Sequence, residues 1–397
     1  MKRALLLPLL LGACVSYKAA PVDVEKTVLD APAPPGGALP LDKAVAWAVL
    51  HNPDLLALRQ RAAGMNVSVP PTPPELEAGI DAEQNPEVIL VLDVFSLLGT
   101  GRRGADKALA RARQNEAWMR HHERAREIAY EIAESYEVER VLASLRLPTV
   151  GFDPAPYVRA GFVPASAEAV IRAATESVRA EGERREAERS ANRLALLRLL
   201  GATPFAKVEI AAAEAPWPEP PQPDWRIMLK ARADLQRQFA SYEVAEAEFR
   251  RAVAEQYPAL VVSPSVGGDP IEFFGSVGIT LPIGAAKEAR AAESARDAAR
   301  LELQGAVLDS LRDAEAARLD ASAAASSLSA ARAHGAAQQE VLRTAMAELE
   351  GRSGSFLDVV FAIEGLIDAA ASEREAAIEE VRARLRAARA AGWPVLP

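Results

Sequence analysis

Two segments of this sequence are too long and too free of helix-breaking residues to fold as anything but very long helices. Between Gly104 and Pro148 the chain has 43 residues without Gly or Pro, rich in Ala, Glu, Arg and Leu. At about 1.5 Å per residue, a helix of this length reaches roughly 65 Å. The second segment, 285–334, is longer and contains only Gly305 as a potential interruption. Charged, Ala-rich helices bury little when alone, so each must pair with another helix.

A return helix is expected after each long segment, which predicts two antiparallel helical hairpins. The return helices cover 165–200 and 335–391, and the breaks before them contain Gly161 or lie near Gly351. Several Pro and Gly residues lie between Val141 and Ala165. They predict that the first hairpin is shortened or irregular.

Each long helix is preceded by a shorter helix and two β-like segments. In the clearest of these, 271–283, apolar residues occupy every second position, which suits a strand in a sheet with one apolar face. The expected ranges are a helix at 41–60 with strands at 75–81 and 87–98, then a helix at 224–253 with strands at 257–266 and 271–283.

The order helix, β-hairpin, long helical hairpin therefore occurs twice. We expect a mostly α fold with a small β part. The first repeat covers 41–204, a linker 205–223, the second repeat 224–392, and a C-terminal tail 393–397.

The N-terminus has the pattern of an exported lipoprotein precursor. Lys2 and Arg3 precede an apolar run too short to span a bilayer, and the tetrapeptide LGAC ending at Cys14 resembles a lipobox. The resemblance implies that 1–13 is a signal peptide and that the Cys14 thiol takes a diacylglycerol, followed by a Pro-rich tether over 14–40. The alternative is an ordinary signal peptide with an incidental buried cysteine.

Composition removes several classes of function. Cys14 is the only cysteine, so neither an intramolecular disulfide nor a cysteine-based metal site can form. The formal charge is −9 and becomes more negative when the leader is lost, which argues against a nucleic-acid partner. No long apolar run follows Cys14, which excludes a helical membrane span, whereas strands of a membrane barrel carry a weaker signal and remain compatible.

The order and duplication of five segments make this chain similar to the TolC-like outer-membrane efflux family, its lipoproteins included. The segments are LDKAVAWAVLHNPDLLALR, LALLRLLGATP, ADLQRQFASYEVAEAEFRRAVAEQYPALVVSPSVG, FFGSVGITLPIGAAKEAR and LEGRSGSFLDVVFAIEGLIDA. The resemblance extends over most of the chain between Leu41 and Gly392 and is stronger in the second half.

The resemblance implies a homotrimer, in which four strands per chain build a shared transmembrane β-barrel and the helices build a trimeric α-barrel through the periplasm. Open strand edges in lipid would leave backbone groups unpaired, so closure with other chains is required. A periplasmic adaptor and an inner-membrane transporter would complete the export path. We therefore expect a passive exit duct held in outer-membrane lipid and anchored on the periplasmic side. The alternative is a non-conducting structural envelope lipoprotein with the same fold.

Gly99, Gly101 and Gly104 form a G-x-G-x-x-G pattern between a strand-like run and a long helix. We interpret them as the hinge between a barrel strand and a tunnel helix, where Gly permits backbone angles that other residues avoid. The alternative is a dinucleotide site, which needs a second parallel strand after a short helix. More than forty helical residues follow here instead.

The resemblance also places the adaptor-facing periplasmic tip at Gly161 with Phe162 and at Gly351 with Arg352. The apolar side chain usual after this Gly in the family is present as Phe162 and replaced by Arg352. Adaptor docking is therefore expected to differ from the usual mode.

No catalytic group, metal site or cofactor is expected. The four histidines, His51, His121, His122 and His334, are scattered, and neighbouring residues on a helix point about 100° apart. The acidic residues of the first strand-like segment, Glu75, Glu77 and Asp81, either line the mouth of the barrel and favour cations or are simply solvated. At seven residues, that segment is shorter than the roughly 9–11 residues needed to span a membrane while tilted.

Overall fold

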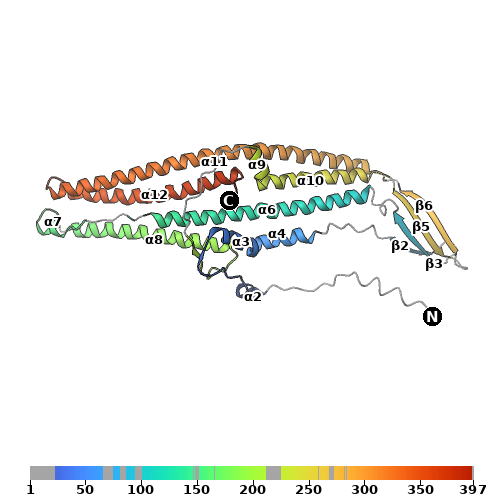
Figure 1. The fold of residues 1–397 in the computed structure, drawn as a ribbon, viewed down its shortest axis with the longest axis horizontal. Helices are drawn as coiled ribbons and strands as arrows, with labels where there is room; N and C mark the ends of the chain where they lie inside the picture. The colour runs from blue at the N-terminus through green and yellow to red at the C-terminus, as the bar shows by residue number, and fades with distance from the viewer. Residues whose placement is uncertain are drawn as a thin grey trace.

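The computed structural model describes residues 23–65, 75–80, 86–93, 101–145, 147, 152–164, 166–211, 225–257, 259–267, 272–280, 282 and 284–395. The described chain is an elongated rod (Figure 1), with long helices side by side, a sheet beyond one end of them, and helical turns at the other end. The predicted signal peptide, Cys14, Asp81 and Gly99 lie outside the described residues.

The same order of elements occurs in both halves. In the first half they are α3 (Leu41–His51), α4 (Pro53–Gly64), β2 (Glu75–Ile80), β3 (Pro86–Asp93), α6 (Arg102–Ser144), α7 (Ala155–Arg159) and α8 (Ala167–Leu199). In the second half they are α9 (Trp225–Ala231), α10 (Ala233–Ala254), β5 (Ala259–Gly267), β6 (Glu272–Thr280), α11 (Ala285–Glu350) and α12 (Phe356–Ala390).

The four longer strands form one antiparallel sheet in the order β2-β3-β5-β6. The central pair, β3 with β5, joins the two halves of the chain, and Val88 lies opposite Val266 in it. Strands β2 and β6 are the edges, so each presents one row of backbone groups that no other described strand pairs. None of the helices in the described part is long and apolar enough to cross a lipid bilayer.

Helix α11 is longer than the sequence suggested. It spans 66 residues and runs through both Gly305 and Gly335, where the second return helix was expected to begin. A single glycine costs a helix about 1 kcal/mol, which packing against a partner helix can offset. The turn comes at 351–355, because Arg352 takes a left-handed conformation and Ser355 caps α12 with a reciprocal capping box.

Both short helices expected before the strands are broken into two. Pro53 lacks a backbone N–H and disfavours a helical conformation at the preceding residue, so α3 ends and α4 begins around Asn52. The Asn52 side-chain oxygen accepts hydrogen bonds from the backbone amides of Asp54 and Leu55, at 2.9 and 3.3 Å. In the second half, the corresponding break between α9 and α10 falls at Arg232.

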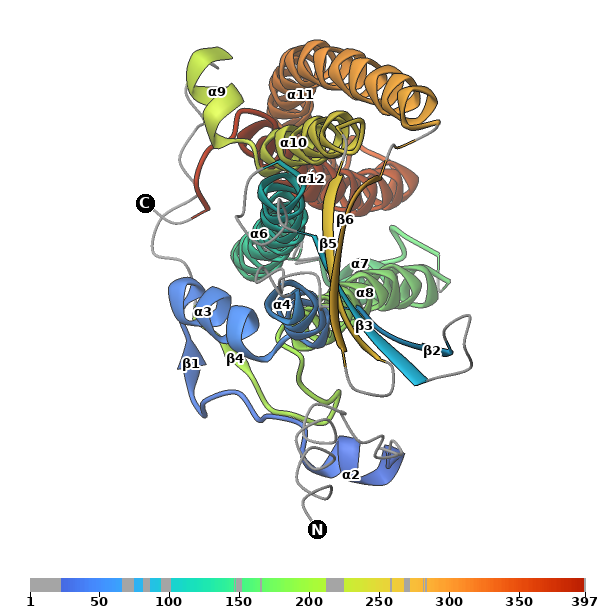
Figure 2. The same cartoon turned by 90° about the vertical axis from the view of Figure 1, so that its right-hand side faces the viewer.

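Part of the segment expected as an extended tether is ordered. It contains α2 (Val24–Leu29), whose first turn is capped by Asp23, and β1 (Ala38–Leu39). Strand β1 pairs in parallel with β4 (Glu209–Ile210), which lies in the predicted linker. The Tyr136 hydroxyl of α6 donates a 2.6 Å hydrogen bond to the buried Leu39 carbonyl. Strand β1 is thereby fixed to the side of the rod, where Figure 2 shows β1 and β4 next to α3.

The core is divided along the rod rather than gathered at one centre. One cluster packs α3, α4, α6 and α8 around Ile132 and Leu196, and a second packs α6 against α12 around Ala133 and Val381. The third lies at the turn end, around Val359 and Ile363. The first two clusters lie on different faces of α6 between Ile128 and Leu142, so the apolar core is concentrated in the middle of the rod and at the turn end.

Candidate functional site

Each passage from strand to long helix contains a glycine at positive φ. The φ angle is 69° at Gly101, before α6, and 99° at Gly284, before α11. A Cβ atom at either position would meet nothing within 4 Å, so the backbone angle rather than crowding requires glycine. Gly104 is helical, in the first turn of α6. Of the predicted hinge glycines in the described chain, Gly101 is therefore the one with the special conformation.

Arg102 connects the two halves of the chain at this junction. Its guanidinium donates hydrogen bonds to the carbonyl oxygens of Tyr257 at 2.8 Å and Glu255 at 3.3 Å, beyond the C-terminal end of α10. A cation at the end of a helix satisfies carbonyls that lack an intrahelical partner and opposes the negative pole of the helix dipole. The glycine pattern identified the hinge but gave no sign of this contact, because Tyr257 lies 155 residues away in the sequence.

At the other end of the rod, the two helical turns share one backbone geometry. The amide of Gly161 donates to the Val158 carbonyl and that of Phe162 to the Tyr157 carbonyl, at 3.0 and 2.9 Å. Arg352 and Ser353 make the same two bonds at the end of α11, at 3.1 and 2.9 Å. By this bond pattern, Arg352 occupies the position in the second turn that Gly161 occupies in the first, and Ser353 occupies the position of Phe162.

Arg352 is strained at this position and contacts the other turn. Its φ of 61° is positive, and it is the only such non-glycine residue in the described ranges. The left-handed conformation costs roughly 1–2 kcal/mol for a residue with a Cβ. Its guanidinium carbon lies 4.3 Å from the centroid of the Phe162 ring, a cation–π distance. The predicted tip residues of the two hairpins are therefore in contact.

An apolar cluster supports the two turns from behind. The Phe152 ring lies 5.5 Å from the Tyr157 ring and 6.2 Å from the Phe356 ring, which connects the irregular segment after α6 to the start of α12. As the prolines predict, α6 ends at Ser144 and is replaced near the turn by the five-residue helix α7. The first hairpin keeps its apolar packing although its first helix is interrupted.

A buried ion cluster ties α8 to α12 above the turns. The Arg374 side chain is 6 % exposed, and its Nε lies 3.0 Å from Oε1 of Glu181, which is 4 % exposed. Glu188, which lies seven residues or about two turns further along α8, also pairs with Arg374. Buried charges of this kind are costly to separate, because each would be left without its counter-ion in a poorly solvated place.

The middle of the rod holds a polar junction in each half. In the first, the Asn52 side-chain amide donates a 2.9 Å hydrogen bond to the Leu199 carbonyl at the end of α8. Gly201 follows with a φ of 69°, and a Cβ there would lie 2.5 Å from the His51 carbonyl oxygen. Both the backbone angle and the close approach therefore require glycine at position 201.

The second half repeats this junction with different chemistry. The Arg232 guanidinium donates to the carbonyl of Ala390, at the end of α12, at 3.3 Å, and to that of Ser310 in α11 at 3.1 Å. Gly392 has a φ of 72°, and a Cβ there would lie 3.0 Å from the Ala231 Cβ. The equivalent helix ends are thus held together by a neutral amide in the first half and by a cation in the second half.

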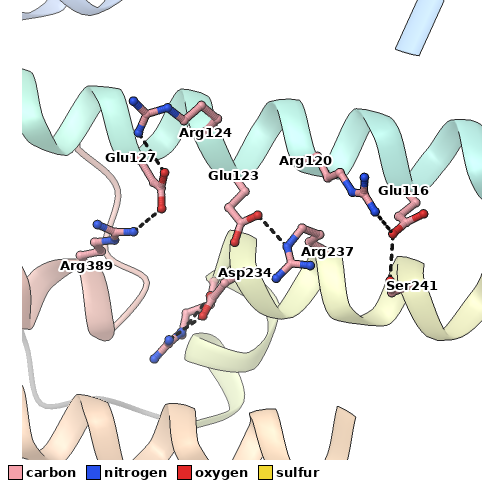
Figure 3. A network of polar contacts seen from close by, with 10 residues as sticks. Glu116, Arg120, Glu123, Arg124, Glu127, Asp234, Arg237, Ser241 and Arg389 are labelled. Carbon is pink, nitrogen blue, oxygen red and sulfur yellow. Dashed lines mark hydrogen bonds and ion pairs between the residues drawn. The ribbon is translucent and has the colours of Figure 1, made fainter. Parts of the chain in front are cut away.

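Ion pairs connect α6 to α10 and α12 across the middle of the rod (Figure 3). Glu123 of α6 pairs with Arg237 of α10 at 2.7 Å, and Glu127 pairs with Arg389 of α12 at 2.6 Å. Burial raises the pKa of Glu123, and the neighbouring Arg237 opposes that shift. These contacts fix the lateral order of the helices rather than forming a reaction site.

His121 and His122 are consecutive residues of α6 that lie close enough to affect each other's protonation. Burial lowers the pKa of both His121 and His122, and the nearby cations Arg59 and Arg126 add to this effect. No group of three or more His, Cys, Asp or Glu residues suited to a metal ion occurs among the described residues.

The fold is that of known outer-membrane channels. Over 90 % of this chain and 91 % of the other, it matches the outer-membrane channel OprN with a TM-score of 0.73 and 17 % identity. The outer membrane protein VceC from Vibrio cholerae matches with a TM-score of 0.69 and 15 % identity, covering 89 % of this chain and 96 % of that one. The open state of the Neisseria gonorrhoeae MtrE channel matches over 89 % of each chain, with a TM-score of 0.67 and 17 % identity.

No protein-family model and no curated relative matches by sequence. At identities below 20 %, the structural likeness establishes the fold. It confirms the resemblance to TolC-like outer-membrane efflux channels that the five sequence segments indicated.

Proposed function

We propose that this chain, which has the fold of TolC-like outer-membrane efflux channels, is the passive exit duct of a tripartite efflux or export system. The observation that carries the proposal is the match to outer-membrane channels along nearly the full length of both chains. Three copies form the duct, with the strands in the outer membrane and the helices in the periplasm.

The open edges of the sheet support assembly with further copies. In a membrane, the backbone groups of β2 and β6 need partners, because lipid offers none. Pairing β2 of one copy with β6 of the next satisfies both edges, and three copies of four strands close a twelve-stranded barrel. Closure removes every edge, so the homotrimer is the membrane-inserted form.

The duct itself needs neither a cofactor nor an energy source. Transport energy comes from an inner-membrane transporter, and a periplasmic adaptor connects it to the turns that contain Gly161, Phe162, Gly351 and Arg352. Contact between Arg352 and Phe162 places a cation at this surface. The adaptor that docks there therefore presents an acidic or aromatic group to it.

Lipidation at Cys14 adds a second attachment to the outer membrane, on its periplasmic side. Pairing of β1 with β4 and the hydrogen bond from Tyr136 hold the chain just before Leu41 against the middle of the rod. In this proposal the lipid assists sorting and assembly, and the barrel provides the passage.

One observation favours a second candidate function, a structural envelope lipoprotein that does not conduct. Strand β2 has six residues, whereas β5 and β6 have nine each. At about 3.3 Å per residue, six residues cover roughly 20 Å, less than the thickness of the hydrocarbon core. A barrel with three such short strands could be sealed or locally distorted.

Planar-bilayer recording of the full-length, detergent-extracted protein distinguishes the two functions. The exit duct requires cross-linked trimers and a steady conductance at constant voltage. Trimers without conductance would refute the exit duct and favour the structural lipoprotein. A protein that stays monomeric in detergent and does not enter bilayers would contradict both, because both need the closed barrel.

A further inference from the structure

Cations gather at the strand-facing end of the rod. We call the basic collar the five residues Arg103, Lys107 and Arg111 of α6 with Lys287 and Arg290 of α11. Four of them are exposed, and Arg103 is half-buried. Within the described part of the chain, none of the five has an ion pair or hydrogen bond. This contrasts with the rest of the rod, where most arginines pair with an acid.

The acids at this end do not neutralise the collar. Asp106 and Glu255 are both held by Arg251, at 3.0 Å each. Glu288 is the one acid in the first turn of α11, and α6 has no acid in its first turn. Arg102 is already engaged with two carbonyls. The five collar cations therefore outnumber the acids that remain unpaired beside them, and this end of the rod carries a net positive charge.

The helix dipoles make this placement unfavourable unless an anion is present. The N-terminus of a helix carries a partial positive charge, so acidic residues are favoured there and basic ones are not. Helix α6 nevertheless begins with two arginines, and Gly101 provides no side-chain cap for it. Arg103 and Lys287, which lie in the first turns of α6 and α11, thus occupy sites where the helix ends add to the attraction of the side chains for external negative charge.

The spacing of the collar matches the depth of a lipid headgroup layer. Arg103, Lys107 and Arg111 follow each other at four-residue intervals, so they lie on one ridge of α6 and rise about 6 Å per step. The headgroup region is roughly 5–8 Å deep on each side of a bilayer. Arg103 and Lys107 then fall within this layer, whereas the backbone of Arg111, about 12 Å from that of Arg103, lies beyond it on the periplasmic side.

Tyr257 gives an independent marker of the same level. Its side chain is 66 % exposed, it lies just before β5, and its carbonyl accepts the hydrogen bond from Arg102. Exposed tyrosines are typical of the boundary between a membrane barrel and water. Through its contact with Arg102, Tyr257 lies close to the start of α6, where the basic collar begins.

We propose that the basic collar binds the phosphate groups of anionic phospholipids in the leaflet facing the periplasm. This inference rests on the proposed membrane insertion of the sheet and adds a lipid partner to it. Lys and Arg bind phosphate by charge and hydrogen bonding, and their long stems lie along apolar surface while the charged group stays at the interface. The collar thereby fixes the depth of the rod in the membrane.

The test uses the full-length protein in mixed micelles of a neutral detergent with either phosphatidylglycerol or phosphatidylcholine. Thermal unfolding, followed by the helical circular dichroism signal, gives the lipid fraction needed for half of the maximal stabilisation. The wild type is expected to respond to phosphatidylglycerol at a lower fraction than to phosphatidylcholine. Each cation near an anionic surface strengthens binding about fivefold, so the variant R103Q/K107Q/K287Q should need at least tenfold more phosphatidylglycerol.

A matched control removes the same charge elsewhere. Arg172, Arg198 and Lys207 are also exposed and have no ion pair among the described residues, but they lie on or after α8, away from the sheet. The variant R172Q/R198Q/K207Q should keep the wild-type response to phosphatidylglycerol. Inorganic phosphate, added to phosphatidylcholine micelles, should not reproduce the stabilisation.

Three outcomes would overturn the proposal. They are equal responses of the wild type to the two lipids, equal responses of the collar and control variants, or full stabilisation by inorganic phosphate. Bilayer conductance of the same preparations separates this inference from the proposed function. Conductance without a preference for phosphatidylglycerol would refute the lipid-binding role of the collar alone. A preference without conductance would refute the duct and support the lipid site.

Discussion

Replacing Gly201 by Ala should destabilise the middle of the rod far more than the same change at Gly161. Both glycines have positive φ, 69° and 75°, so alanine at either position meets the left-handed penalty of roughly 1–2 kcal/mol. Only Gly201 adds a clash, because its new Cβ would lie 2.5 Å from the His51 carbonyl oxygen and 3.1 Å from the Asn52 Cα. Both contacts are to backbone, so neither can be relieved by a side-chain rotation.

The magnitude follows from these two contributions. Overpacking of a close contact costs about 1–3 kcal/mol, so Gly201→Ala should cost about 2–5 kcal/mol in total and Gly161→Ala about 1–2 kcal/mol. Gly392→Ala should fall between them, because its nearest new contact is the Ala231 Cβ at 3.0 Å. The order of the three variants tests the crowding separately from the backbone angle.

Hydrogen exchange provides the local measurement. The amides of Asp54 and Leu55 are bonded to the Asn52 side chain, so their protection reports whether this junction stays closed. Each 1.4 kcal/mol lost at the junction should lower protection tenfold. Equal losses of stability in Gly201→Ala and Gly161→Ala, or unchanged protection of 52–56 in the former, would refute the argument from close approach.

Three further predictions concern buried polar groups. Arg374→Gln should lower the free energy of unfolding by about 3–5 kcal/mol in denaturant titrations, because the buried Glu181 loses its closest cation and keeps only the exposed Arg184 at 3.9 Å; a loss below 1 kcal/mol would contradict the burial. Tyr136→Phe should cost about 0.5–1.5 kcal/mol by the same measurement, since it removes one of the two hydrogen bonds to the buried Leu39 carbonyl, which still accepts from the Ala211 amide at 3.1 Å, whereas Tyr242→Phe, for which the described chain has no side-chain hydrogen bond, should cost little. Burial lowers the pKa of His121 and His122 in the folded state, so the unfolded state binds protons at a higher pH than the folded state does. The free energy of unfolding should therefore fall as the pH drops from about 7.5 through 6. A variant with both histidines replaced by Gln that loses stability with pH as steeply as the wild type would argue against this assignment.

The regular part of the fold could be predicted because its signals are local. Long runs without Gly or Pro define α6 and α11, and alternating apolar residues define β6. The end of α11 was placed too early, since Gly335 is a weaker stop signal than the capping residues at 351–355. The breaks at Asn52 and Arg232 had a signal as well, in Pro53 for the first and in the parallel between the two halves for the second.

The contacts at the candidate sites could not be predicted, because their partners are distant in sequence. Arg102 meets the end of α10 across more than 150 residues, and Arg374 meets Glu181 across nearly 200. A local pattern identifies such arginines as charged helix residues and nothing more. The duplicated junction does have a sequence signal, since LLGATP at the end of α8 and AAGWP at the end of α12 both contain Gly followed closely by Pro.

The two polar junctions also make the rod a lever with unequal arms. The second junction holds α11 at Ser310, which is 25 residues from its start and 40 from its end, or about 38 and 60 Å. A small rigid tilt about this point therefore displaces the turn end about 1.6 times as far as the strand end. An opening movement at the turns would therefore require only about 0.6 times that displacement at the sheet, where the strands must stay paired.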